Sequence, residues 1–349
     1  MNFALDDDVV PLVDSIADFF ERRGDAEAIA GAAGRSQAFD RRRWTALCGL
    51  GLPVLRLPEP DGIGAGLLEA TAVAETFGAV LLPEPATATI VLAAAWSAHQ
   101  DGAAFVRELA AGSRVTVLTG FDTAVLSAAG EVSGRITIPD GTPIDAVAVP
   151  ARDDYTGEAA IVVLDIATLP QPLSRNEIDP TRPSAAVVLE RVEPRDVLRL
   201  TDSDCERVRC EFTLLTLAEL VGGMQKVLTQ TVEYVKAREQ FGRPIGSFQA
   251  VKHRLADFYA VTEQARAAVQ FAALECVQES GAASASVASV ARWLPRSAIG
   301  VLEDAIHLHG GMGYSWELDV HLHLRRALSV RSALQDSGTA VLPNFSAAL

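Results

Sequence analysis

Cysteine is scarce in this sequence, and its copies are scattered. The four residues Cys48, Cys205, Cys210 and Cys276 form no C-x-x-C pair of the kind that many zinc sites and redox motifs use. We therefore expect reduced thiols, with neither a disulfide framework nor a metal site.

Positive charge is also short. Thirty Lys and Arg residues stand against 45 Asp and Glu, which gives a formal net charge of -15 at pH 7. Because nucleic-acid-binding proteins need a basic patch to neutralise phosphates, such a role is not expected.

Long apolar runs are missing as well. No stretch reaches the roughly 18 apolar residues of a membrane span, so no membrane role is expected. The first residues, MNFALDDDVVPL, lack the basic and apolar regions of a signal peptide. The expected location is therefore the cytoplasm.

What the chain does contain is an alternation of three zones. Residues 1–112 show apolar residues at helical spacing, broken by a Pro- and Gly-rich loop at residues 55–66. Residues 113–198 hold short β-branched runs bounded by Gly, Pro and Asp, which predicts antiparallel strands. Residues 199–349 return to long helical segments with apolar stripes. We predict three domains with these boundaries: helical, β and helical.

Four segments carry more specific patterns. From Tyr234 the chain reads YVKAREQFGRPIGSFQAVKHRLAD, at the joint between two long predicted helices. Residues 305–327 read AIHLHGGMGYSWELDVHLHLRRA, residues 44–78 read WTALCGLGLPVLRLPEPDGIGAGLLEATAVAETFG, and residues 179–192 read DPTRPSAAVVLERV. In this order, the segments resemble the flavin-dependent acyl-CoA dehydrogenase family across nearly the whole chain.

The resemblance implies both a fold and an activity. The family's α+β architecture has an N-terminal helical domain, a middle antiparallel β-barrel and a C-terminal four-helix bundle. Its members are dimers or dimers of dimers with FAD at a subunit interface. They oxidise the α,β bond of an acyl-CoA thioester. We therefore expect FAD as cofactor and an acyl-CoA as substrate.

The Tyr234 segment supplies most of the candidate cofactor residues. Arg238 suits a bidentate contact to the pyrophosphate of FAD, although it could instead cap its own helix. Gln240 and Gln249 stand in register with the family motif. Phe241 and Phe248 either pack beside adenine or belong to the core.

The second family segment adds three candidates. Gly310 and Gly311 let the backbone approach a ligand closely, and the same residues also suit the end of a helix. His307 stands where family members usually have Gln, so it either bonds the adenosine side of FAD or is a structural residue.

The catalytic base departs from the family pattern. The reaction needs a carboxylate held beside the thioester. Family members commonly place this Glu in a Glu-Gly-Thr context, but residues 332–340 here read SALQDSGTA, where Asp336 is the nearest acid. The alternative family position falls at Phe212, next to Glu211, and one helical residue turns a side chain by about 100°. Glu211 and Asp336 are weak candidates, and we assign no base.

The flavin-ring motifs are absent too. The family has a Thr-Glu-Pro-x-Ala-Gly-Ser-Asp loop and a Trp-(Ile/Ser)-Thr strand, whereas residues 115–137 read VTVLTGFDTAVLSAAGEVSGRIT. Residues normally given to a neighbour's FAD are kept, while those for the chain's own flavin ring are missing. This asymmetry resembles the smaller subunit of actinobacterial heteromeric acyl-CoA dehydrogenases of the steroid type. It predicts a homologous catalytic chain as partner, in a heterodimer or heterotetramer, and a bulky acyl group.

Two other functions stay open from the sequence. The chain is alternatively a self-sufficient homomeric enzyme with Glu211 or Asp336 as base, or a flavin-free acyl-CoA-binding module. Arg325 and Arg326 are interpreted as a solvated helix face, with interfacial ion pairs or phosphate contacts as the alternatives. The alternation of His321 and His323 places their imidazoles on different faces of a helix.

Overall fold

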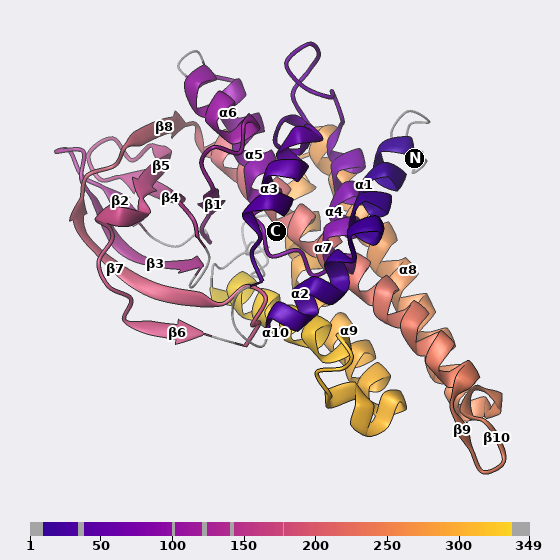
Figure 1. The fold of residues 1–349 in the computed structure, drawn as a ribbon. Helices are drawn as coiled ribbons and strands as arrows, with labels where there is room; N and C mark the ends of the chain where they lie inside the picture. The colour runs from indigo at the N-terminus through magenta and orange to yellow at the C-terminus, as the bar shows by residue number, and fades with distance from the viewer. Residues whose placement is uncertain are drawn as a thin grey trace, which may run out of the picture.

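Helices dominate the described N-terminal and C-terminal parts of the chain, and a β-sheet lies between them in sequence (Figure 1). The computed structural model describes residues 10–33, 38–99, 102–120, 124–139, 143–176 and 178–336. This arrangement confirms the predicted order of helical, β and helical zones. The helix-to-strand change falls between α6 and β1, and the change back falls between β8 and α7.

The N-terminal helices form where apolar spacing and local breakers allow. Asp40 begins one of them by accepting a hydrogen bond from the backbone N–H of Arg42 at 2.7 Å. Pro83 and Pro85 separate two others, because a proline disfavours helical backbone in the residue before it. The helices are α1 (Val10–Arg23), α2 (Asp25–Ala33), α3 (Arg41–Gly49), α4 (Leu67–Ala79), α5 (Ala86–Ser97) and α6 (Ala103–Ala110), with the short turn η1 (Leu52–Val54) after α3.

The middle zone is an eight-stranded sheet in the order β6-β7-β3-β2-β4-β5-β8, with β1 paired to β4. Five of its strands form at the β-branched runs predicted from the sequence, which are residues 114–120, 134–141, 145–151, 159–167 and 184–192. The strands are β1 (Thr116–Leu118), β2 (Ala124–Leu126), β3 (Val132–Pro139), β4 (Ala146–Asp153), β5 (Ala159–Asp165), β6 (Ser174–Asn176), β7 (Ser184–Val192) and β8 (Asp196–Leu200), with the turn η2 (Ile166–Thr168) after β5.

The sheet is mixed rather than purely antiparallel, and its described strands do not close into a barrel. In the sheet, β2 lies between β3 and β4. The connection from β3 to β4 therefore crosses over β2, and β4 runs parallel to β2. β1 pairs with the first part of β4 and β2 with its last part, so the two short strands share one edge of β4.

The C-terminal zone confirms the predicted four-helix bundle. Thr201 begins its first helix, where the hydroxyl oxygen accepts a hydrogen bond from Asp204 N at 3.1 Å. None of the described helices combines the length and apolar character needed to cross a membrane. The elements are α7 (Asp202–Ala237), β9 (Glu239–Gln240), β10 (Arg243–Pro244), η3 (Ile245–Ser247), α8 (Gln249–Val277), α9 (Ala283–His309), η4 (Gly310–Tyr314) and α10 (Val320–Asp336).

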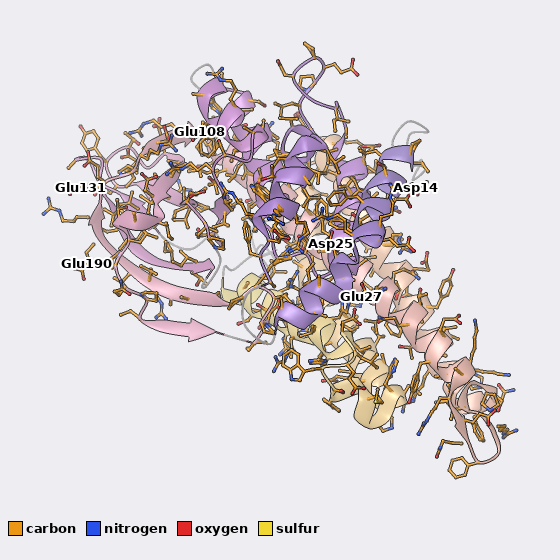
Figure 2. All side chains as sticks on the ribbon, in the orientation of Figure 1. Asp14, Asp25, Glu27, Glu108, Glu131 and Glu190 are labelled. Atoms are coloured by element: carbon orange, nitrogen blue, oxygen red, sulfur yellow. The ribbon has the colours of Figure 1, made fainter. Side chains whose placement is uncertain are left out.

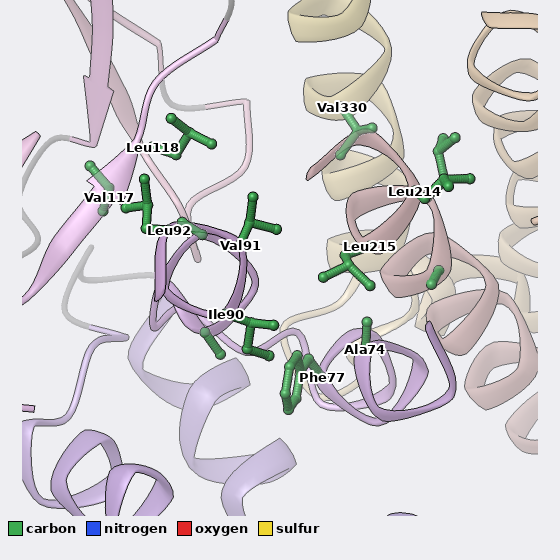
Figure 3. Packing of buried hydrophobic residues seen from close by; sticks show 14 of the residues in the cluster. Ala74, Phe77, Ile90, Val91, Leu92, Val117, Leu118, Leu214, Leu215 and Val330 are labelled. Carbon is green, nitrogen blue, oxygen red and sulfur yellow. The ribbon is translucent and has the colours of Figure 1, made fainter. Parts of the chain in front are cut away.

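One apolar core runs through all three zones. Figure 3 shows side chains of α4, α5, β1, α7 and α10 meeting at their junction. Two glycines allow α4 and α7 to cross closely: a Cβ on Gly78 would lie 1.7 Å from Glu219 O, and one on Gly222 would lie 1.8 Å from Glu75 O. The bundle and the N-terminal helices therefore form one packed unit.

A buried ionic cluster fastens the same junction. Arg326 of α10 pairs with Asp179, which follows β6, and its Nη1 lies 3.4 Å from Glu219 of α7. Arg182 binds the same Glu219 carboxylate at 2.7 Å and the carbonyl of Leu82. The interpretation of Arg326 as solvated was wrong, because α10 is covered here by the sheet zone and α7. Burial lowers the pKa of Arg326, and nearby Arg182 adds to this effect.

Candidate nucleotide-binding site

Strands β9 and β10 follow α7 and form a hairpin with a two-residue turn, which points away from the core (Figure 1). Phe241 and Gly242 have φ values of +55° and +78°, which is the pattern of a type I′ turn. Ile245 N donates a hydrogen bond to Arg238 O at 2.8 Å and closes the loop. The turn leaves the Phe241 side chain 91% exposed.

The polar candidates of this segment face solvent. Arg238, Gln240 and Gln249 are all exposed. No hydrogen bond or ion pair engages the Arg238 guanidinium within the described part of the chain, although its backbone N–H donates to Tyr234 O at 2.8 Å. The guanidinium therefore does not cap α7 and is free to meet an external anion.

The aromatic candidates are surface groups rather than core residues. Phe248 is half-buried under the guanidinium of Arg243, whose Cζ lies 4.1 Å from the ring centre. The ring of Phe241 meets it edge to face, with 6.1 Å between centroids. Figure 2 shows side chains projecting outward around this hairpin, while the labelled acidic residues lie elsewhere, over the sheet and the N-terminal helices.

The glycine turn after α9 divides into an open part and a packed part. Gly310 has φ of +61° with ψ of -139°, a conformation that is essentially restricted to glycine. A Cβ on Gly310 or Gly311 would meet nothing within 4 Å, so the backbone here is open to a ligand. Gly313 differs, because a Cβ there would lie 2.6 Å from Ile306 O. His307 is exposed in the last turn of α9.

Contacts between α7 and α9 bring the two segments to the same end of the bundle. The Tyr234 hydroxyl donates to His309 O at 3.3 Å, and the two rings stack with 4.3 Å between centroids. The sequence analysis missed both residues. The available signal was Thr231, a polar residue within the buried stripe of α7, which faces the His309 ring.

These groups fit the nucleotide end of FAD. A free guanidinium suits a pyrophosphate, open glycine backbone allows close approach, and exposed aromatic rings suit adenine. This fit concerns the nucleotide end of FAD alone. In the stretch that replaces the family's ring-binding motifs, Thr119 is buried and Phe121–Thr123 lie outside the described residues.

The two weak candidates for the catalytic base, Glu211 and Asp336, differ in what the structure describes of their surroundings. Glu211 is buried on α7 and forms an ion pair with Arg56, from the loop after η1. Accepting a substrate proton would break this pair and leave a largely buried guanidinium uncompensated. Phe212, at the alternative family position, packs against the core. Asp336 is the last residue of α10, and its side chain lies outside the described part of the structure.

Comparisons with known proteins agree with this architecture. Residues 213–333 match the model of the acyl-CoA dehydrogenase C-terminal domain. The chain is 32% identical over 320 residues to acyl-CoA dehydrogenase IpdE2 of Mycobacterium tuberculosis, covering 90% of this chain and 89% of that protein.

Two solved structures are similar over nearly the whole chain. The ChsE4-ChsE5 complex from Mycobacterium tuberculosis gives a TM-score of 0.82 at 26% identity, covering 98% of this chain and 97% of the matched chain. The Tcur3481-Tcur3483 steroid ACAD G363A variant gives 0.81 at 25% identity, covering 96% and 97%. The chain therefore belongs to the acyl-CoA dehydrogenase family, oxidoreductases that act on the CH–CH bond of acyl-CoA thioesters.

Proposed function

We propose that this chain is the smaller subunit of a heteromeric acyl-CoA dehydrogenase. It holds the nucleotide end of an FAD whose reactive ring is held by a homologous catalytic chain. The observation that carries the proposal is the exposed Arg238, whose guanidinium has no hydrogen-bond or ion-pair partner among the described residues and which lies close in sequence to the exposed Gln240 and Phe241. FAD supplies the hydride acceptor, and this chain supplies phosphate, adenine and backbone contacts through Arg238, Phe241, Phe248, Gln240, Gln249, His307, Gly310 and Gly311.

The distribution of exposed aromatic residues supports a partner chain. Every exposed Phe or Trp among the described residues lies in the C-terminal zone, which also carries the candidate nucleotide-binding residues. These exposed residues are Phe241, Phe271, Trp293 and Trp316. Aromatic residues at this exposure are typical of interfaces. The zone that carries the nucleotide residues therefore also carries surface aromatic residues that suit a second subunit.

The surroundings of Glu211 support a non-catalytic role for this chain. Glu211, the described candidate, is engaged with Arg56, so the catalytic carboxylate is expected on the partner chain. For the substrate, the proposal is a bulky, steroid-type acyl-CoA. Its support is the similarity to a structure described as a steroid ACAD and to one described as a complex of two differently named chains.

The test compares the chain alone with the chain co-expressed with a longer homologous acyl-CoA dehydrogenase. The single chain should purify almost colourless. The pair should be yellow, with fewer FAD molecules than chains by absorbance after denaturation. Full flavin absorbance in the single chain would contradict the proposal and favour a self-sufficient homomer.

A substitution in this chain tests whether Arg238 contacts the FAD. Arg238→Ala should lower the FAD affinity of the pair by about tenfold or more, because a charged hydrogen bond contributes about 1.5–3 kcal/mol. Arg207→Ala is the matched control, since Arg207 is an exposed arginine near the other end of α7. Stabilisation of the single chain by an acyl-CoA, with no effect of FAD on the pair, would instead favour a flavin-free binding module.

A further inference from the structure

A buried histidine lies directly behind the glycine turn. His309 is the last residue of α9 and is only 4% exposed. Its Nε2 lies 3.2 Å from the Thr231 hydroxyl oxygen, and its ring stacks on Tyr234. Its backbone carbonyl accepts the Tyr234 hydroxyl at 3.3 Å. Ring and backbone of one residue thus both attach to α7, within seven residues of Arg238.

The hydrogen bonds select one form of the imidazole. The Thr231 hydroxyl donates to Val227 O at 2.7 Å, so its oxygen is left to accept from His309. We therefore assign the proton to Nε2, which leaves Nδ1 as an acceptor. Nδ1 is buried and has no partner among the described residues, so none of them would accept a hydrogen bond from a second proton on Nδ1.

We propose that His309 is a positioning residue, which in its neutral form holds the Gly310–Gly311 turn at a fixed place relative to Arg238. The inference rests on the proposed function, because it assumes that these two segments hold one nucleotide. Gly310 follows His309 directly, and Arg238 lies one helical turn beyond Tyr234. A rigid joint between His309 and Tyr234 therefore sets the spacing of the backbone and guanidinium contacts.

Protonation should loosen this joint. Burial lowers the pKa of His309, and the opposing Asp319 raises it. Asp319, just before α10, and Tyr234 on α7 are the described titratable groups facing the ring. A proton on Nδ1 would place a charge with no acceptor in a buried position, which is costly. Acid should therefore weaken FAD binding once the pH falls through the lowered pKa of His309, without a direct contact between His309 and FAD.

The experiment measures the FAD affinity of the co-expressed pair between pH 8 and pH 5 by reconstituting the flavin-free complex. His309→Ala should lower the affinity at pH 7.5 by about tenfold, as expected for one lost buried hydrogen bond and a lost stack. His309→Gln should restore most of it, because its amide N–H reaches toward Thr231 and does not titrate. The same variant should abolish the acid-dependent loss.

Milder variants keep the test clear if His309→Ala misfolds. Tyr234→Phe keeps the stack and removes only the hydroxyl, so a smaller loss, about threefold to tenfold, is expected. Tyr259→Phe, an exposed tyrosine of α8, and His99→Gln, a histidine outside the bundle, are the controls and should match the original pair.

The outcomes separate the inference from the proposed function. If Arg238→Ala releases FAD but His309→Ala and Tyr234→Phe bind it normally, the positioning role is wrong and the nucleotide site stands. If Arg238→Ala also binds FAD normally, the site itself is wrong. A His309→Gln pair that keeps the original acid sensitivity would likewise contradict the role of His309.

Discussion

Helices α5 and α8 differ sharply in how much of their surface their own chain covers. Ten of the 12 residues of α5 are buried, whereas only six of the 29 residues of α8 are. α5 carries no charged residue, whereas α8 carries six, which accounts for part of the difference. α5 is surrounded by the sheet and other helices, while α8 packs through one stripe and runs outward to the hairpin (Figure 1).

The tryptophans repeat the contrast. Trp44 and Trp96 are buried in the N-terminal zone, whereas Trp293 and Trp316 are exposed in the C-terminal zone at 38% and 55%. The N-terminal zone thus completes its core within one chain. The C-terminal zone presents aromatic side chains that only another molecule would cover, which is where the proposed partner and nucleotide site lie.

The largest expected effect concerns the cluster that joins the two zones. Arg326→Ala leaves Asp179 buried without its guanidinium, and removing one partner of a buried ion pair typically costs about 3–5 kcal/mol. Urea unfolding of the single chain should show this loss. Arg325→Ala, at the neighbouring and less buried arginine, should cost less than about 1 kcal/mol. Equal losses would mean that the cluster does not fasten the junction.

Two tryptophan substitutions test the contrast in burial between the N-terminal and C-terminal zones. Trp44→Ala opens a cavity in a packed core, so a loss of about 3–5 kcal/mol is expected for the single chain. Trp293→Ala should cost the single chain less than Trp44→Ala does, because 38% of Trp293 is already exposed. Size-exclusion chromatography of the co-expressed pair then tests the interface. An unchanged association would remove Trp293 from it.

These contrasts also set the limit of what the sequence could predict. Helical spacing, proline positions and β-branched runs predicted the order of elements, because they are local signals. Strands β2, β6 and β8 were missed, since each is short and depends on its neighbours in the sheet. The parallel pairs of β4 were missed for the same reason, because strand direction is set by how the chain crosses the sheet.

Side-chain surroundings were the least predictable part. His321 and His323 do project from different faces of α10, yet both are buried, because the start of this helix is enclosed on more than one side. Arg326 was misjudged in the same way. For the site, motif resemblance selected residues that the structure places mostly at the surface, but the joint formed by Tyr234 and His309 required the packing of α7 against α9.

Low pH is expected to reduce the free energy of unfolding by an intermediate amount, through His323. Burial lowers the pKa of His323 to about 4, with Asp319 and Asp179 opposing and Arg326 and Lys226 assisting. The unfolded chain takes up this proton near pH 6.5, so stability falls as the pH drops from 6.5 to about 4, by on the order of 3 kcal/mol. His323→Leu should flatten this part of the profile in urea unfolding at several pH values. A profile of unchanged slope would assign the acid sensitivity to other groups.

The smallest effect on stability is expected at the hairpin tip, and its sign is opposite. Phe241 is 91% exposed and has φ of +55°, so the side chain adds no core contact while its backbone is in a region that non-glycine residues rarely adopt. Phe241→Asn suits this turn better and should stabilise the single chain by a few tenths of a kcal/mol.

The same substitution should weaken FAD binding by the co-expressed pair, because it removes an aromatic face beside the proposed adenine position. Thermal unfolding of the chain and flavin titration of the pair check the two halves separately. A residue kept at some expense to its own fold, on the face that its own chain leaves bare, is the pattern expected of a ligand contact. A stabilised chain whose pair binds FAD with unchanged affinity would show that the strained turn serves something other than the nucleotide.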